Sequence, residues 1–195
     1  MTRSPCKILT QQRASNRRPP CDVYVKEFYG SRDIATHAEY ISNAFGALDK
    51  PHNCHTIGMT QESIDIMVSN THRTKSKYIL IATQDGKPRG VAIAHIKNTN
   101  GRVKNIFVDH LCSTGTCRGA GRALIEHMMT VALKHRCPHL ELQATQDAIP
   151  FYERLGFTSE NTTNKMKLNV LWYFSCYIRS LLSENDKRNI GMVFL

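Results

Sequence analysis

The segment Cys117-Arg-Gly-Ala-Gly-Arg-Ala-Leu124 has the residue types that bind an anion. It lies between a predicted strand and a predicted helix, where Gly119 and Gly121 allow a tight backbone turn because they lack a Cβ atom. The first N–H groups of a helix have no partner within the helix, and the helix dipole adds partial positive charge there. Arg118 and Arg122 add charge beside these donors. Alone, the segment fits either an ordinary helix start or a site for a pyrophosphate group.

A second segment, Ala148-Ile-Pro-Phe-Tyr-Glu-Arg-Leu-Gly-Phe157, predicts a short helix that ends at a glycine. Its spacing places Ala148, Phe151 and Leu155 on a packed face and leaves Tyr152 partly exposed. Alone, the segment indicates packing rather than chemistry.

Together the two segments resemble the GNAT superfamily of acyl-CoA-dependent N-acetyltransferases. The family's acetyl-CoA motif, Arg/Gln-x-x-Gly-x-Gly/Ala, stands here as Arg118 to Ala123. The family's later Ala-x-x-Phe-Tyr-x-x-x-Gly-Phe helix has every fixed position filled from Ala148 to Phe157. The resemblance covers about residues 22–170. It implies an α/β fold (α+β in some schemes), in which a single domain has a mixed central sheet, helices on both faces and a splayed strand pair.

The resemblance also implies which residues hold acetyl-CoA, the co-substrate. Backbone amides of the glycine-rich turn would hold the pyrophosphate. The strand before the turn would diverge from the strand at 139–144, and pantetheine would pass between them. Thr145 stands where many relatives have an asparagine that contacts pantetheine. The predicted binding residues are Phe107, Val108, Arg118, Gly119, Ala120, Gly121, Arg122, Ala123, Thr145 and Tyr152.

Two registers are open for the end of the strand before the turn. Leu111-Cys112-Ser113 stands five residues before the arginine, where relatives usually end this strand. Ile106 to Asp109 has the stronger strand pattern. We favour the second register, which implies a five-residue insertion across His110 to Thr116.

Acetyl transfer to an amine needs two proton steps, because only the neutral amine attacks and the CoA thiolate is better released as a thiol. Tyr152 matches the tyrosine that many relatives use as the general acid toward the thiolate. Asp109 and His110 are the candidate general bases. Neighbours on a strand point to opposite faces, so we expect at most one of them to face the site.

These features predict an N-acetyltransferase that moves an acetyl group from acetyl-CoA to a primary amine by direct attack in a ternary complex. We favour a small acceptor such as a polyamine or an amino sugar, and a protein lysine or N-terminus is the alternative. A catalytically silent acyl-CoA sensor and a basic nucleic-acid-binding module are the alternatives of another class. His52, Cys54 and His55 lack a fourth ligand at a suitable spacing, so we assign no metal site.

The composition is that of a globular protein: 195 residues, of which 41% are hydrophobic and 22% charged. No apolar run approaches the roughly 18 residues that span a bilayer, so we expect no membrane association. The net charge is +10, and five basic residues and no acid lie in residues 1–21. The seven cysteines are scattered without a CxxC pair, which favours reduced thiols and a cytoplasmic protein. A nuclear or mitochondrial location stays open. A homodimer also stays open.

The charge marks a basic arm (1–21), the resemblance implies an acetyltransferase domain (22–170), and an extension of unknown role (171–195), for which a helix is one interpretation, follows. Within the domain the pattern of apolar residues predicts strands at 22–29, 78–83, 90–96, 103–108, 139–144 and 165–170. It predicts helices at 34–48, from Thr60, at 121–135 and at 147–155.

Overall fold

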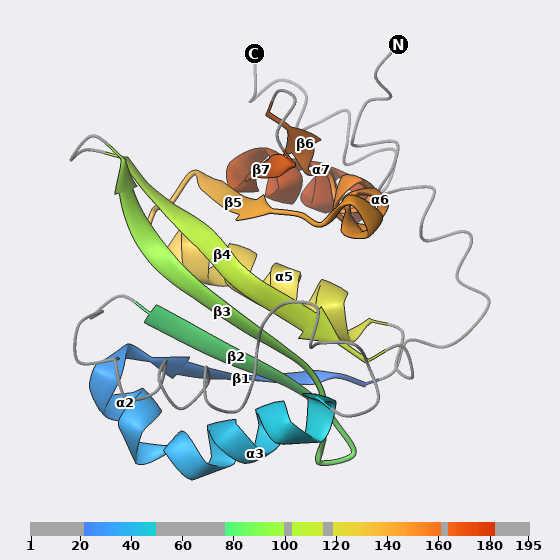
Figure 1. The fold of residues 1–195 in the computed structure, drawn as a ribbon. Helices are drawn as coiled ribbons and strands as arrows, with labels where there is room; N and C mark the ends of the chain where they lie inside the picture. The colour runs from blue at the N-terminus through green and yellow to red at the C-terminus, as the bar shows by residue number, and fades with distance from the viewer. Residues whose placement is uncertain (1–21, 50–76, 100–102, 115–118, 161–163, 182–195) are drawn as a thin grey trace.

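A computed structural model describes residues 22–49, 77–99, 103–114, 119–160 and 164–181 (Figure 1). The basic arm and the helix predicted from Thr60 lie outside the described residues. The strands are β1 (Tyr24–Tyr29), β2 (Lys77–Gln84), β3 (Lys87–Thr99), β4 (Val103–Ser113), β5 (His139–Gln143), β6 (Thr158–Ser159) and β7 (Lys165–Asn169). The helices are α2 (Gly30–Thr36), α3 (Ala38–Asp49), α5 (Ala120–Lys134), the 3₁₀ turn η3 (Gln146–Ala148), α6 (Ile149–Arg154) and α7 (Val170–Leu181).

The strands form one mixed sheet in the order β1-β2-β3-β4-β5-β7-β6. Every neighbouring pair is antiparallel except β4 and β5, which are parallel and are joined by the crossover helix α5. The predicted mixed sheet with helices on both faces is therefore confirmed. Figure 1 shows β4 and β5 lying together near the start of β4 and separating toward its end.

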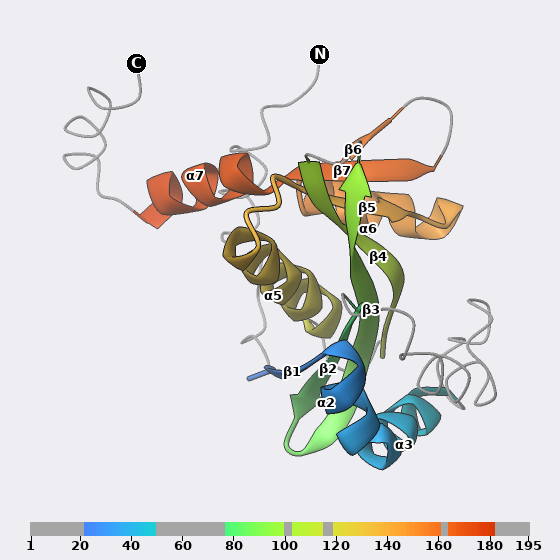
Figure 2. The same ribbon diagram turned by 90° about the vertical axis from the view of Figure 1, so that its left-hand side faces the viewer.

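Two hydrophobic cores lie on the two faces of the sheet, and β2 contributes to both. Tyr78, Leu80 and Ala82 point into the core under α5, and Ile79 and Ile81 point into the core under α2 and α3. A strand buried on both faces has a continuous apolar run in its sequence, as this strand does from Tyr78 to Ala82. Figure 2 shows the sheet between α5 and α7 on one side and α2 and α3 on the other.

The turn predicted between β2 and β3 is confirmed. Asp85 and Gly86 both have positive φ angles, 51° and 73°, which is the conformation that a two-residue hairpin requires. The helix predicted at 34–48 differs from the structure at its start. The helical region begins four residues earlier, at Gly30, and His37 separates it into α2 and α3.

The cysteines differ from the expectation of reduced thiols. Cys137 is a buried free thiol, whereas Cys112 and Cys176 each take part in a disulfide. No helix among the described residues is long and apolar enough to cross a bilayer.

Candidate active site

Strand β4 is longer than predicted and ends at Ser113. Gly90 to Ile93 of β3 pair with Ser113 to His110, and the Thr114 amide donates to the Arg89 carbonyl at 2.8 Å. The favoured strand end at Ile106 to Asp109, and the insertion that it implied, are therefore wrong. Strand β3 pairs with the polar end of β4, including His110 and Ser113, and so keeps it in the sheet.

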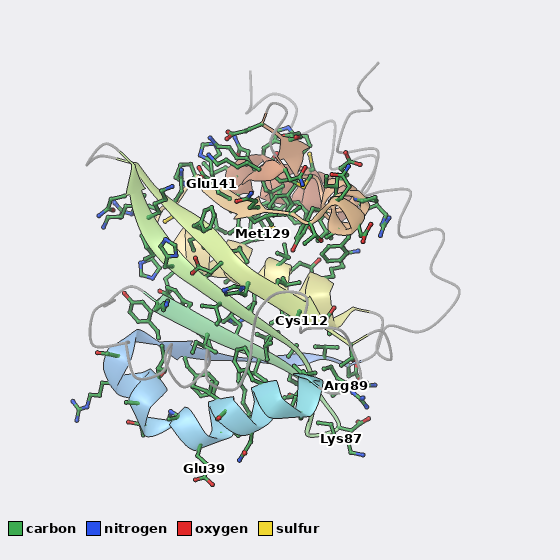
Figure 3. All side chains as sticks on the ribbon, in the orientation of Figure 1. Glu39, Lys87, Arg89, Cys112, Met129 and Glu141 are labelled. Atoms are coloured by element: carbon green, nitrogen blue, oxygen red, sulfur yellow. The ribbon has the colours of Figure 1, made fainter. Side chains whose placement is uncertain are left out.

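Strand β4 pairs with β5 over only three residues. Ile106, Phe107 and Val108 lie opposite Leu140, Glu141 and Leu142. No residue of β4 after Val108 pairs with β5. Figure 3 shows Cys112 on the separated part of β4 and Glu141 on β5. Phe107 and Val108 thus lie in the joined part of the two strands, and their contact with the cofactor stays a prediction.

A β-bulge lies at the point where β4 leaves β5. Ala94 of β3 pairs with Val108 and the preceding residue Ile93 pairs with His110, so Asp109 is an extra residue on β4. Ile93 belongs to the core under α2 and α3, so His110, directly opposite, faces that side. Asp109 bonds to His95, which shares that face because it lies two residues after Ile93. Both candidate bases therefore lie on one face, and the expected alternation is wrong here.

Asp109 forms a pair with His95, a residue that the sequence did not single out. The Oδ2 atom of Asp109 lies 2.8 Å from Nδ1 of His95, and the two side chains are 25% and 31% exposed. His110 has a buried Nδ1 atom without a hydrogen-bond partner among the described residues. Burial lowers the pKa of His110 below its ordinary value. The register between β3 and β4 would identify His95 as a neighbour of Asp109. The sequence does not give that register, because it depends on the bulge.

Helix α5 begins immediately after the glycine-rich turn, as predicted. Gly119 precedes the helix with a φ of 127°, and the Ala123 amide donates to the Gly119 carbonyl at 2.8 Å. Ala123 was predicted to offer a free amide, but the helix already uses it. The amides of Ala120, Gly121 and Arg122 precede this first helical bond and have no acceptor within α5. Arg118 lies outside the described residues.

The Arg122 side chain is held within the helix rather than extended. Its Nε atom donates to Oε1 of Glu126 at 2.8 Å, one turn along α5. The Tyr173 hydroxyl of α7 donates to the same oxygen at 3.4 Å. The positive charge of Arg122 is therefore partly offset by the Glu126 carboxylate.

Gly121 brings three elements of the site together. A Cβ atom at this position would lie 3.1 Å from Oγ of Ser113 and 3.3 Å from Cζ of Phe151. The end of β4, the first turn of α5 and helix α6 are thus packed against one another. Their contact fixes the helix start relative to the separated end of β4.

Tyr152 lies in α6 and is more buried than predicted, at 7% exposure. Its ring packs between those of Phe151 and Phe157, with centroids 5.0 and 5.5 Å away. Burial raises the pKa of Tyr152 to about 12. Thr145 is exposed at the start of η3, where the chain leaves β5. Among the described residues, no three His, Cys, Asp or Glu side chains gather as metal ligands.

Comparisons with known proteins agree with this architecture. The acetyltransferase (GNAT) domain matches residues 58–172, which is more than half of the chain. No curated protein sequence matches. Among solved structures, AtaTR bound with AcCoA is 14% identical and has a TM-score of 0.57, covering 80% of this chain and 98% of its own.

Two further structures give the same result. A "predicted acetyltransferase with acetyl-CoA" from Clostridium acetobutylicum is 12% identical, covering 77% of this chain and 97% of its own, with a TM-score of 0.54. A ribosomal-protein-alanine N-acetyltransferase from Brucella melitensis biovar Abortus 2308 is 16% identical, covering 72% and 95%, with a TM-score of 0.53. At these identities the likeness is one of fold.

Proposed function

This chain belongs to the GNAT family of acetyltransferases, and we propose that it transfers an acetyl group to a primary amine, with a small amine such as a polyamine or an amino sugar as the acceptor. The chain is an acyltransferase, and acetyl-CoA is its co-substrate. The identity of the acceptor and the roles of individual residues are the proposed part.

The separation of β4 from β5 carries the proposal. The two parallel strands stop pairing after Val108, although β4 continues for five more residues to Ser113. The edge of β4 that faces β5 is therefore left without a strand partner from Asp109 to Ser113 among the described residues. Such an edge presents backbone N–H and C=O groups. An extended amide-containing molecule such as pantetheine can pair with them.

The residues at the start of α5 fit a pyrophosphate. The amides of Ala120, Gly121 and Arg122 have no acceptor within the helix, and the helix dipole favours negative charge at this end. Gly119 is exposed, and a Cβ atom there would meet nothing within 4 Å. The turn therefore leaves room for a phosphate to reach the amides. Gly121 holds this helix start against Ser113, at the end of the exposed edge.

The chain supplies a general acid for the leaving group. Acetyl-CoA provides the acyl group as a thioester, and the acceptor nitrogen forms a C–N bond as the C–S bond breaks. Tyr152 donates its phenolic proton to the departing sulfur, and solvent then restores that proton. Because burial raises the pKa of Tyr152 to about 12, the phenol is protonated at neutral pH. A backbone amide on the edge from Asp109 to Ser113 polarises the thioester carbonyl, a contact worth about 3 to 4 kcal/mol in other acyl transfers.

The acceptor side of the site is the sheet face that carries Asp109. This face has the Asp109 carboxylate, which pairs with His95, and the aromatic ring of Phe107. The centroid of the Phe107 ring lies 5.6 Å from that of the His95 imidazole. The Lys97 ammonium already lies 5.5 Å from the centroid of the Phe107 ring, so the Asp109 carboxylate is the group on this face that suits a cationic amine. Glu39 of α3 points away from the sheet in Figure 3.

Two measurements test the proposal in order. Calorimetry with acetyl-CoA should show saturable binding to the full chain, and absence of binding would overturn the assignment at its base. Release of CoA thiol should then be measured with spermidine, glucosamine, a lysine peptide and an alanine-terminated peptide. Faster release with spermidine or glucosamine supports a small acceptor, whereas release with the peptides alone would replace it with a protein acceptor.

A further inference from the structure

We propose that His95 is the general base of the reaction and that Asp109 is a positioning residue that orients the His95 imidazole. This inference rests on the proposed function. It changes the role predicted for Asp109, and it gives a catalytic role to a residue on the neighbouring strand.

The position of the pair is the first argument. Asp109 immediately follows Val108, the last residue of β4 that pairs with β5. Asp109 therefore lies at the point where the two strands separate, next to the backbone edge proposed to hold the thioester, and it contacts His95 on the neighbouring strand β3. His95 is 31% exposed, so a molecule on this face of the sheet can reach it.

The hydrogen bond between the two side chains decides which one can accept a proton. A carboxylate can only accept a hydrogen bond, so Nδ1 of His95 carries the proton in the 2.8 Å contact with Oδ2 of Asp109. The neutral imidazole then keeps its lone pair on Nε2. Asp109 stabilises the imidazolium that forms when Nε2 takes a proton. This arrangement suits a base that must be neutral before the reaction and charged after it.

His110 is less well placed, although it lies on the same face. Its Nδ1 atom is buried without a hydrogen-bond partner among the described residues. Burial also lowers the pKa of His110, because the charged form loses solvation. Among the described residues, no hydrogen bond to a carboxylate fixes the tautomer of the His110 ring. His110 therefore lacks the feature that prepares His95.

The nitrogen of the neutral amine attacks the thioester carbon and forms the C–N bond, and Nε2 of His95 takes one proton from that nitrogen. The C–S bond breaks, and the sulfur takes a proton from Tyr152. The products are the amide and CoA thiol, while solvent removes the proton from His95 and returns one to Tyr152.

The charged and titratable groups around His95 come from three strands. Lys77 of β2 lies directly opposite His95, and Lys97 lies two residues further along β3. Asp109 and His110 face it from β4. Asp109 is the acidic group of this set that bonds to the imidazole, and the two lysines add positive charge around it.

The test uses the acceptor that gives the fastest CoA release and measures kcat from about pH 5 to about pH 9, because kcat reports groups in the substrate complex. H95Q should lower kcat about 100-fold and remove the acid limb that belongs to the imidazole. D109N should lower kcat by about tenfold and keep an acid limb, because the imidazole that takes the proton is still present. Both variants should bind acetyl-CoA with the wild-type Kd, which shows that they fold.

The chain offers a matched control in His127, whose Nε2 atom lies 2.7 Å from Oε2 of Glu27 with side-chain exposures of 29% and 26%. This pair lies on the α5 face of the sheet, so H127Q should keep both kcat and the acid limb. Loss of the limb in D109N with retention in H95Q would make Asp109 itself the base and overturn the proposal.

Two other outcomes separate this inference from the function on which it rests. Amine-dependent turnover that H95Q leaves within about threefold of wild type would overturn the role of His95 alone. Binding of acetyl-CoA without acceleration by any amine would overturn the proposed function, and the role of His95 with it.

Discussion

Ser113 and Gly121 lie in direct contact, so that a Cβ atom on Gly121 would come within 3.1 Å of the Ser113 Oγ atom. This contact joins the last residue of β4 to the first turn of α5. Both surfaces proposed to hold acetyl-CoA are therefore positioned by one small pair of residues.

The first prediction follows from this contact. G121A should raise the Kd for acetyl-CoA about tenfold, because the new methyl group pushes the helix start away from β4. S113A removes the atom at 3.1 Å and leaves the serine Cβ at 3.7 Å, an ordinary contact distance. The double variant S113A/G121A should therefore recover part of the loss. Calorimetry of the four proteins measures the coupling, and additive effects would contradict the explanation.

Gly119 provides a second prediction. Its φ of 127° is strained for any residue with a side chain, although a Cβ atom there would meet nothing within 4 Å. G119A should lower the free energy of unfolding by about 1 to 3 kcal/mol and weaken acetyl-CoA binding, because the turn before α5 must change. Gly86 in the β2–β3 hairpin is the control, with a φ of 73° and equally open space. G86A should lose stability and keep its Kd.

The role of Tyr152 gives a third prediction. Y152F should lower kcat about 100-fold at unchanged acetyl-CoA affinity, because the thiolate then leaves without a proton donor. Y78F is the control, since Tyr78 is a buried tyrosine of the sheet whose hydroxyl contacts His135. Equal loss of kcat in both variants would indicate a general effect on folding.

The raised pKa of Tyr152 sets the alkaline behaviour. Its pKa lies at about 12 because of burial, so the phenol keeps its proton well above the ordinary value of 10.0. The rate should therefore not decline through Tyr152 until the pH approaches this value. A pH–rate profile whose alkaline limb below about pH 10 disappears in Y152F would contradict this assignment.

His110 gives a prediction about stability. Burial lowers its pKa below 6.5, so the unfolded chain takes up a proton that the folded chain resists. This contribution to stability is fully present above the unfolded pKa and is lost as the pH falls below it. H110Q should reduce the fall in unfolding free energy by up to about 1.4 kcal/mol per pH unit in that range. Urea titrations at several pH values measure the slope, and parallel curves would refute the idea.

The parts of the fold that local sequence determines could be predicted. The Asp85-Gly86 turn, the start of α5 and the helix that carries Tyr152 each depend on residues next to one another in the chain. A glycine with positive φ or an unpaired helix start acts over a few residues, so the sequence carries the information.

The parts that failed depend on the neighbouring strand. The end of β4 was placed too early because Cys112 and Ser113 do not read as a strand, yet β3 supplies their hydrogen-bond partners. The pairing of His95 with Asp109 depends on a bulge that no local pattern indicates. Strand β6 has only two residues, Thr158 and Ser159, and exists because β7 pairs with it.

The bulge gives β4 one residue that the pairing with β3 does not require. Val108 and His110 oppose the adjacent residues Ala94 and Ile93, so a chain lacking Asp109 would keep every later residue of β4 on its present face. Deletion elsewhere in the strand would exchange the two faces. Asp109 is thus surplus to the architecture, and a protein without it should still fold and hold CoA. What such a protein would lose is the carboxylate that orients His95, which makes this deletion a way to separate the scaffold from the orientation of the base.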